Sequence, residues 1–177
     1  VEDKFVVGHV GRFMYQKNHT FLIDIFAEIY KQNQNAVLLL IGEGELEQKI
    51  REKISKLGLT QAVIFTGSIP NVNEMYQIMD VFLLPSLYEG LPVVGVEAQA
   101  SGVRTIFSDT ITREVSVTDT TEFVPLASSA QKWADAVLKY ANGYERKDMT
   151  KEIIKAGYSI HTEAEKLQNL YIKMMEE

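Results

Sequence analysis

The sequence predicts an α/β fold in which six parallel strands form a doubly wound sheet, with helices on both faces and a helical C-terminal tail. Two observations predict it. Short apolar runs alternate with segments of helical period from residue 5 to residue 126, and alternating strands and helices favour a parallel sheet. The run 36–41 is apolar throughout, which is typical of a parallel strand covered on both faces.

The predicted elements follow one another in chain order. The strands are 5–10, 36–41, 63–66, 81–84, 105–107 and 122–124, and the helices are 18–32, 45–57, 73–79 and 92–101. Gly58 and Gly102 follow two of these helices, where glycine favours the C-terminal stop. Ser129 is predicted to cap a helix. From there the pattern is helical to the end, divided into three pieces by Gly143 and Gly157.

The composition is that of one globular domain, 1–177, with the sheet in 5–126 and the helical tail in 129–177. The formal net charge of -6 excludes a broad nucleic-acid surface, because phosphate backbones need clustered Lys and Arg. The sequence contains no cysteine, which excludes disulfides and fits a reducing compartment. No signal peptide or bilayer-spanning run is visible. A strand begins almost at once, so we expect either a domain cut from a longer protein or a short natural N-terminus.

The loop 85–92 after the fourth strand is the most informative segment, because doubly wound sheets bind ligands beyond the carboxyl ends of their strands. It reads PSLYEGLP and continues as VVGVEAQASG. Pro92 is expected at the first helical position, so that free N–H groups face the crevice and suit a phosphate or a sugar oxygen. These groups belong to Leu91, Val93 and Val94. Gly90 allows a ligand to approach the backbone.

Two carboxylates flank this segment. Glu97 lies in a helix of small and apolar residues, so we expect it to be buried, where an unpaired carboxylate is costly. No Lys or Arg lies three or four residues away. The carboxylate therefore either accepts the two hydroxyls of a ribose or bonds to the backbone without a ligand. Glu89, eight positions earlier, either contacts the other end of the same ligand or is a solvated surface residue.

The loop 11–18 after the first strand carries two cations, Arg12 and Lys17, five positions apart. Arginine offers a forked donor set that matches phosphate oxygens, and lysine offers a compact charge. Gly11 leaves space where a ligand would approach. The alternative is a pair of solvated surface cations with no ligand.

Other segments carry weaker signals. The turn 42–44 reads GEG and can approach a ligand, but it lacks the third glycine of a dinucleotide-binding fingerprint. The turn after the third strand forms either a wall for a flat base or a simple turn. Its residues are Ser68, Ile69 and Pro70. His9, His19 and His161 show no spacing typical of metal ligands, so we expect no metal site. Trp133 is expected in the core.

Together these motifs resemble the C-terminal, Rossmann-like domain of the retaining glycosyltransferases with the GT-B fold, called family 4 or group 1. The most specific element runs from Glu89 to Glu97, with seven residues between the carboxylates, and the second runs from Gly11 to Lys17. The resemblance is clear over about residues 5–126 and loose over the helical tail.

The resemblance implies a role for each residue of the site. Arg12 and Lys17 would bind the diphosphate of a sugar nucleotide and stabilise it as the leaving group. Glu97 would hold the ribose hydroxyls, and Glu89 would contact the hydroxyls of the donor sugar. The backbone of Gly90, Leu91, Pro92 and Val93 would assist, and Ser68, Ile69 and Pro70 would line the base. No metal ion or cofactor is expected, and a UDP-sugar is the favoured donor.

The family also carries an N-terminal domain that binds the acceptor, with the active site between the two domains. This chain does not supply that domain, so we expect it to bind nucleotide weakly and to transfer no sugar alone. The implied whole protein is a cytoplasmic enzyme, free or peripheral at the inner face of the cytoplasmic membrane, with a saccharide or lipid-linked acceptor and no nucleic-acid partner. Asn18 and the stretch 108–115 resemble the capsular and exopolysaccharide branch, which indicates polysaccharide biosynthesis. Arg104, in place of the usual proline, and Gly95 are interpreted as packing variations.

Two other classes stay open. One is a non-catalytic nucleotide-binding or regulatory module, which the presence of all four charged site residues disfavours. The other is a response-regulator-like domain, which requires an acidic pair after the first strand, where this sequence has cations. The helical tail either packs across the domain or reaches toward the absent half. Its apolar stripe is typical of a packing face and also compatible with a membrane surface. The stripe comprises Leu167, Leu170, Tyr171 and Met174.

Overall fold

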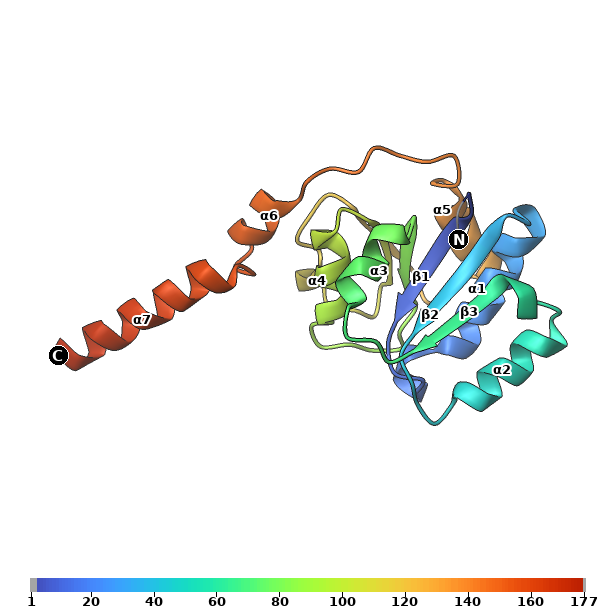
Figure 1. Cartoon of the computed structure of the whole chain (residues 1–177), viewed down its shortest axis with the longest axis horizontal. Coiled ribbons are helices and arrows are strands. Elements are labelled where there is room, and N and C mark those ends of the chain that lie inside the picture. The colour runs from blue at the N-terminus through green and yellow to red at the C-terminus, as the bar shows by residue number, and fades with distance from the viewer. Residues whose placement is uncertain (1–2, 177) are drawn as a thin grey trace.

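The computed structural model describes residues 3–176 and contains a sheet of six parallel strands (Figure 1). The strands are β1 (Phe5–Val10), β2 (Ala36–Ile41), β3 (Val63–Gly67), β4 (Val81–Leu84), β5 (Arg104–Ser108) and β6 (Thr121–Val124). Each lies within one residue of the range that the sequence predicts. The doubly wound parallel sheet is therefore confirmed.

The helices also follow the predicted order. They are α1 (His19–Gln32), α2 (Glu47–Lys56), α3 (Val72–Ile78), α4 (Val93–Ala100), α5 (Ala130–Leu138), α6 (Thr150–Lys155) and α7 (Ile160–Glu176). Asn18 precedes α1 in the left-handed conformation, with φ at 55°, which asparagine tolerates better than most residues. Ser129 caps α5 as predicted, because its side chain accepts a hydrogen bond from the backbone N–H of Lys132.

The order of the strands in the sheet is β3-β2-β1-β4-β5-β6. β1 pairs with β2 on one side, where Val7 lies opposite Leu38, and with β4 on the other, where Val7 lies opposite Val81. After β3 the chain crosses back over β1 to form β4, so the order reverses between β1 and β4. Such a reversal opens a crevice at the carboxyl ends of the two strands, where doubly wound proteins bind ligands.

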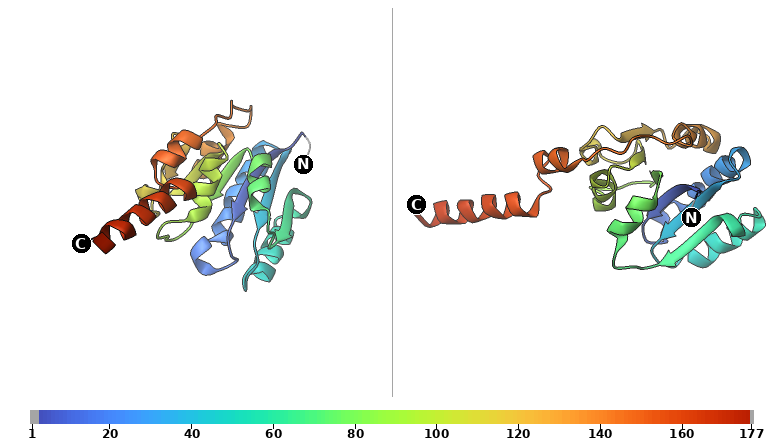
Figure 2. Two further views of the ribbon diagram at one scale, coloured as in Figure 1. Left: turned by 60° about the vertical axis from the view of Figure 1, so that its left-hand side comes forward. Right: turned by 45° about the horizontal axis from the view of Figure 1, so that its top comes forward.

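Helices cover both faces of the sheet (Figure 2), and an apolar layer lies on each face. One contains α1, α2 and α5, and Val7 of β1 points into it; the other contains residues of α3 and α4, and Val6 of β1 points into it. Trp133 is fully buried in the first layer, as predicted, and its ring N–H donates to Pro125 O at 3.2 Å. The alternation along β1 follows from the two-residue period of a strand.

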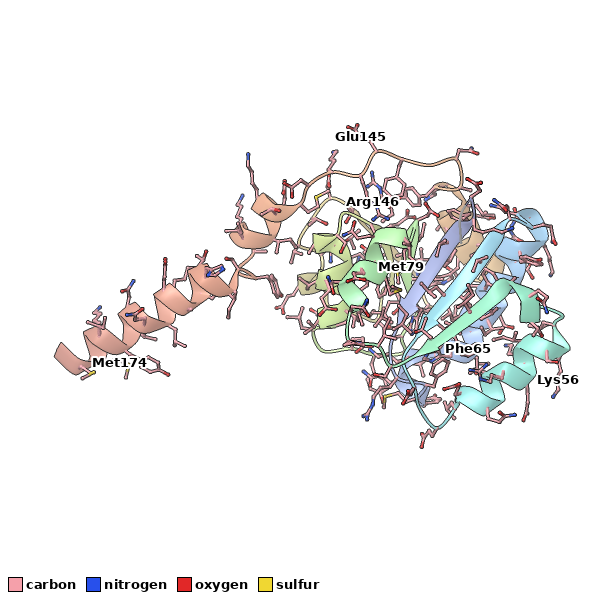
Figure 3. All side chains as sticks on the ribbon, viewed as in Figure 1. Lys56, Phe65, Met79, Glu145, Arg146 and Met174 are labelled. Atoms are coloured by element: carbon pink, nitrogen blue, oxygen red, sulfur yellow. The ribbon has the colours of Figure 1, made fainter. Side chains whose placement is uncertain are left out.

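The segment 139–149 differs from the prediction, because none of it is helical. Its side chains bond to the body of the domain instead. The hydroxyl of Tyr144 donates to Asp80 O at 2.8 Å. The guanidinium of Arg146 donates to backbone carbonyls at the end of α3 and to Met79 O (Figure 3). A cation at a helix C-terminus stabilises the free carbonyls there, so tertiary contacts outweigh the local helical pattern.

Helix α7 projects away from the sheet (Figures 1 and 2). Residues 164–175 are all exposed, including the predicted apolar stripe, and Met174 near the C-terminal end is 65% exposed (Figure 3). In this structure α7 therefore does not pack across the domain, whereas α5, the first helix of the tail, does. Within residues 3–176, no helix has both the length and the hydrophobicity that a membrane span requires.

Candidate functional site

Two loops follow the strands on either side of the reversal of strand order, 11–18 after β1 and 85–92 after β4. Direct hydrogen bonds join these loops, although they are far apart in the sequence. The bonds run from Leu87 N to Gln16 O (2.8 Å), from Gln16 Nε2 to Tyr88 O (2.9 Å) and from Asn18 Nδ2 to Pro85 O (3.1 Å). The two loops therefore form one structural unit at the carboxyl ends of the strands.

Lys17 and Glu89 form an ion pair within this unit. Nζ of Lys17 lies 2.6 Å from Oε1 of Glu89, and the two side chains are 15% and 8% exposed. Ser86 Oγ donates to the same carboxylate oxygen at 2.8 Å, and the Gln16 amide donates to the other oxygen at 2.9 Å. Glu89 is therefore a largely buried carboxylate whose two oxygens both accept hydrogen bonds, and the alternative of a solvated loop residue is wrong.

Glu97 does not occupy the buried position expected from the sequence. It is exposed on α4, whereas Gln99, two residues later, is fully buried. The Gln99 side-chain oxygen accepts the backbone N–H groups of Val117 and Thr118, each at 3.0 Å, and its amide donates to Val115 O at 2.6 Å. The buried polar residue of α4 is thus Gln99, which holds the loop after β5 in place.

Tyr76 holds Glu97 by a hydrogen bond. The sequence analysis did not identify Tyr76 as a site residue. The Tyr76 side chain is buried, and its hydroxyl lies 3.0 Å from Oε2 of Glu97 and 3.2 Å from Val94 O. Burial, and after it the neighbouring Glu97 carboxylate, raises the pKa of Tyr76 above its usual range. The phenol therefore stays protonated and donates to Glu97. The sequence gives little sign of this contact, because Tyr76 and Glu97 lie in different helices, 21 positions apart.

A hollow of about 490 Å³ opens beside Glu97 and Tyr76, and it extends to Pro70. One oxygen of the Glu97 carboxylate accepts from Tyr76, and the side chain borders this open space. A carboxylate held from one side and open on the other can accept hydroxyl groups of a ligand.

Arg12 borders a second hollow, of about 630 Å³, together with residues of 42–45 and Ser68. Its side chain is exposed. Within residues 3–176, its guanidinium makes no hydrogen bond or ion pair. Five donors are therefore available for an anion in this hollow.

The turn 68–70 lies between the two hollows. Ser68 borders the hollow of Arg12, and Pro70 borders the hollow of Glu97. The structure thus places Lys17 and Glu89 in contact, and it places Arg12 and Glu97 at neighbouring hollows that share this turn. All of these groups follow the carboxyl ends of strands in one sheet.

Pro92 and two glycines of the loops differ in part from the sequence-based prediction. Pro92 is the N-cap of α4 rather than its first helical residue. Space at Gly11 serves protein packing, because an added Cβ would lie 3.0 Å from His9 Nε2 and 3.2 Å from Lys17 Cδ. Gly90 differs, since an added Cβ would meet no atom within 4 Å. Leu91 and Val93, on either side of Pro92, are 43% and 61% exposed.

His9 and His19 lie together beneath the loop 11–18, a contact that the sequence reading did not foresee. Their ring centroids are 4.7 Å apart, and both side chains are buried. Burial lowers the pKa of His9 to about 4 and that of His19 to about 2. His9 Nδ1 lies 2.8 Å from Leu83 O, so this nitrogen carries the proton. Among residues 3–176, no three His, Cys, Asp or Glu side chains are placed to hold a metal ion.

The chain is similar to known proteins in sequence. A family model described as "Glycosyl transferases group 1" matches residues 1–159. The chain is 36% identical over 172 residues to the putative glycosyltransferase EpsF of Bacillus subtilis. The aligned region covers 96% of this chain and 45% of EpsF. It is 38% identical over 90 residues to the amylovoran biosynthesis glycosyltransferase AmsD of Erwinia amylovora, covering 51% of this chain and 25% of AmsD. The chain spans less than half the length of these relatives.

Solved structures share the fold at lower sequence identity. The pneumococcal O-GlcNAc transferase GtfA, in complex with UDP and GlcNAc, superposes with a TM-score of 0.82 at 19% identity, over 99% of this chain and 37% of GtfA. The C-terminal domain of the group 1 glycosyl transferase LpcC from Francisella tularensis superposes with a TM-score of 0.71 at 21% identity, over 88% of this chain and 87% of that domain. At these identities the likeness shows the fold.

Proposed function

The chain belongs to the group 1 glycosyl transferases, and we propose that it is the half of such an enzyme that binds the sugar-nucleotide donor. The observation that carries the proposal is the placement of four charged residues at one edge of the sheet. The Lys17–Glu89 pair lies at the reversal of strand order, and Arg12 and Glu97 border hollows that share the turn 68–70. An elongated ligand with an anionic centre and a hydroxyl-rich end fits this arrangement.

In the proposed complex the two cations bind the donor diphosphate. Arg12 offers its unengaged guanidinium, and Lys17 exchanges a contact with Glu89 for one with phosphate. Glu89 then turns a carboxylate oxygen toward the hydroxyls of the donor sugar. Glu97, held by Tyr76, accepts the ribose hydroxyls, and the turn 68–70 lines the base. The backbone of 90–93 completes the diphosphate and sugar site.

The proposed reaction transfers the sugar with retention of configuration. The bond between C1 of the sugar and the diphosphate oxygen breaks, and the acceptor hydroxyl oxygen forms a new bond to C1 on the same face. The acceptor proton passes to the departing diphosphate. Arg12 and Lys17 accelerate this step by stabilising the negative charge that develops on the leaving group. No residue of this chain is assigned as a general base.

The donor, the acceptor and the cellular role are proposed from the relatives. GtfA is solved with UDP, and so is Anabaena HepE, which makes a UDP-sugar the first donor to test. EpsF and AmsD point to a polysaccharide or lipid-linked saccharide acceptor. An N-terminal domain outside this chain would bind that acceptor. We place the full-length protein in the cytoplasm, free or at the inner membrane face.

Calorimetry with UDP, GDP and ADP tests the donor site on this chain. We expect UDP to bind and both Arg12→Ala and Glu97→Ala to abolish measurable binding. Lys49→Ala, which removes an exposed cation from α2, is the control and should bind as the unmodified chain does. Binding of none of the three nucleotides would contradict the proposal.

A transfer assay tests the assignment of this chain as half an enzyme. We expect no sugar transfer from any donor when an acceptor is added to the chain alone. Turnover by the chain without a further domain would contradict that assignment but not the proposal that this chain binds the donor.

A further inference from the structure

We propose that Glu43 is a positioning residue that holds the turn 68–70 at a set distance from the Arg12 loop. The inference rests on the proposed function, in which this turn lines the base of the donor and Arg12 binds its diphosphate. Glu43 belongs to the GEG turn after β2. In this role, Glu43 sets the distance between the base-binding turn and the diphosphate-binding loop, so that one ligand can contact both.

The Glu43 side chain bonds directly to the turn. Its Oε1 accepts the backbone N–H of Ser68 at 3.1 Å. The same oxygen would lie 3.2 Å from a Cβ added at Gly67, whose φ is 68°. The left-handed conformation of Gly67 thus brings the backbone close to the Glu43 carboxylate. The carboxylate accepts the N–H of Ser68, the residue that follows Gly67. A charged acceptor makes this hydrogen bond stronger than one between neutral groups.

The Glu43 backbone bonds to the opposite loop. Its carbonyl oxygen accepts the N–H of Phe13, next to Arg12, at 3.0 Å. The glycines on either side allow this close approach. A Cβ at Gly42 would lie 2.4 Å from Gly11 O, and a Cβ at Gly44 would lie 2.6 Å from Phe13 O. The loops after β1 and β2 therefore meet backbone to backbone, with no room for side chains between them.

One residue consequently connects the two parts of the proposed site. The backbone of Glu43 is bound to the Arg12 loop, and its side chain is bound to the turn 68–70. In a nucleoside diphosphate the base and the diphosphate are joined covalently, so their separation must match that of the protein groups. Loss of the Glu43 carboxylate releases the turn and leaves the cation loop in place. Inorganic pyrophosphate, which has no base, does not contact the turn and serves as the matched probe.

Three variants separate position from charge. Glu43→Ala removes the acceptor and one negative charge. Glu43→Gln removes the charge and keeps a side-chain oxygen that can accept the Ser68 N–H. Glu45→Ala removes one negative charge from an exposed side chain that borders the same hollow, so it controls for charge near the diphosphate. Both positions, Glu43 and Glu45, are exposed, which favours normal folding of the variants.

Calorimetry compares UDP with pyrophosphate on each variant. For Glu43→Ala we expect the UDP dissociation constant to rise about tenfold, the effect of one lost charge-assisted hydrogen bond. Its pyrophosphate dissociation constant should equal that of Glu45→Ala. Glu43→Gln should restore most of the UDP affinity. An equal loss for UDP and pyrophosphate in Glu43→Ala, or the same UDP loss in Glu45→Ala, would overturn the inference.

Amide hydrogen exchange at Ser68 gives a readout that needs no ligand. In Glu43→Ala the Ser68 amide should exchange about tenfold faster than in the unmodified chain, while Glu43→Gln and Glu45→Ala leave it nearly unchanged. Unchanged exchange in Glu43→Ala would overturn the inference and leave the proposed function standing. Failure of the unmodified chain to bind UDP would overturn the proposed function and this inference with it.

Discussion

Lys17 Nζ lies 2.6 Å from Glu89 Oε1, although the two residues are 72 positions apart in the chain. The contact exists because β1 and β4 are neighbours in the sheet. Both side chains are largely buried, so the removal of one leaves the other charged group with little water to replace it. The pair therefore contributes to stability as well as to the proposed donor site.

The first prediction concerns this pair. Lys17→Met should lower the free energy of unfolding by about 3 kcal/mol, because it leaves a buried carboxylate without its cation. Adding Glu89→Gln should recover much of that loss, since the neutral amide needs no counter-charge. Urea denaturation measures both. The control is Lys139→Ala, which breaks an exposed pair with Glu122 and should cost less than about 1 kcal/mol. Equal losses for Lys17→Met and Lys139→Ala would contradict the prediction.

Tyr76→Phe should weaken UDP binding by about three- to tenfold, because Glu97 loses the donor that orients it. The ring remains packed against Phe82, with which it makes an edge-to-face contact at 5.8 Å, so stability should fall by only about 1 kcal/mol. Tyr144→Phe is the matched control. It removes a hydroxyl that bonds to Asp80 O at 2.8 Å, outside the candidate site, and should cost similar stability without affecting UDP affinity. Unchanged UDP affinity in Tyr76→Phe would exclude its role in holding Glu97.

The buried histidines predict a loss of stability in acid. Burial lowers the pKa of His9 to about 4 and of His19 to about 2 in the folded chain, against an ordinary value of about 6.5 when unfolded. At a pH between the folded and the unfolded pKa values, the unfolded state binds more protons than the folded state. Stability is therefore full above about pH 6.5 and falls as the pH decreases, by up to about 1.4 kcal/mol per pH unit for each histidine.

Replacement of one histidine tests this dependence. His19 stacks on Phe13 with ring centroids 4.2 Å apart, so His19→Phe keeps an aromatic ring there. Its unfolding free energy should decline less steeply between pH 6 and pH 4, by about 1.4 kcal/mol per pH unit relative to the unmodified chain. His161→Phe, at an exposed position in α7, should leave the slope unchanged. Parallel slopes for His19→Phe and the unmodified chain would contradict the assignment of a neutral buried imidazole.

The loss of stability on replacing a glycine with alanine should depend on the space around that glycine. Gly42 has a φ of 130°, and a Cβ there would lie 2.4 Å from Gly11 O, so Gly42→Ala should destabilise the fold by more than about 2 kcal/mol. Gly58 has a φ of 71° in open space, and alanine there should cost about 1 kcal/mol. Gly90→Ala meets open space and should leave thermal stability nearly unchanged while weakening UDP binding. A Gly42→Ala variant as stable as Gly90→Ala would rule out the close backbone contact between the loops after β1 and β2.

A chain ending at residue 159 should be as stable as the longer one. Residues 164–175 of α7 are exposed, and the family model ends at residue 159. Truncation therefore removes little buried apolar surface, and the free energy of unfolding in urea should change by less than about 0.5 kcal/mol. A larger loss would show that α7 packs on the domain in solution.

Most of the fold could be predicted because it rests on local patterns. A run such as 36–41, apolar at every position, requires cover on both faces wherever it lies in the sheet. The loops 11–18 and 85–92 could be selected for a similar reason, since they follow strands and carry charged residues. Membership of the family follows from motifs of this kind, and the match over residues 1–159 confirms it.

The candidate site could be predicted only in part. Glu97 was expected to be buried, but in the structure the buried polar residue is Gln99. A helix turns by about 100° per residue, so two positions move a side chain to the other side. The helix VVGVEAQA has apolar residues all around, and its pattern does not show which side faces the sheet. Packing against the sheet decides that.

The sequence by itself determined the type and order of the elements, the loops that bear charge and the family. These depend on neighbours along the chain. Only the tertiary structure decided that Lys17 pairs with Glu89, that Tyr76 supports Glu97, and that 139–149 is held by its contacts with α3 rather than continuing as a helix. Each of these contacts joins segments distant in sequence, so its existence depends on strand order and helix orientation, which no local pattern contains.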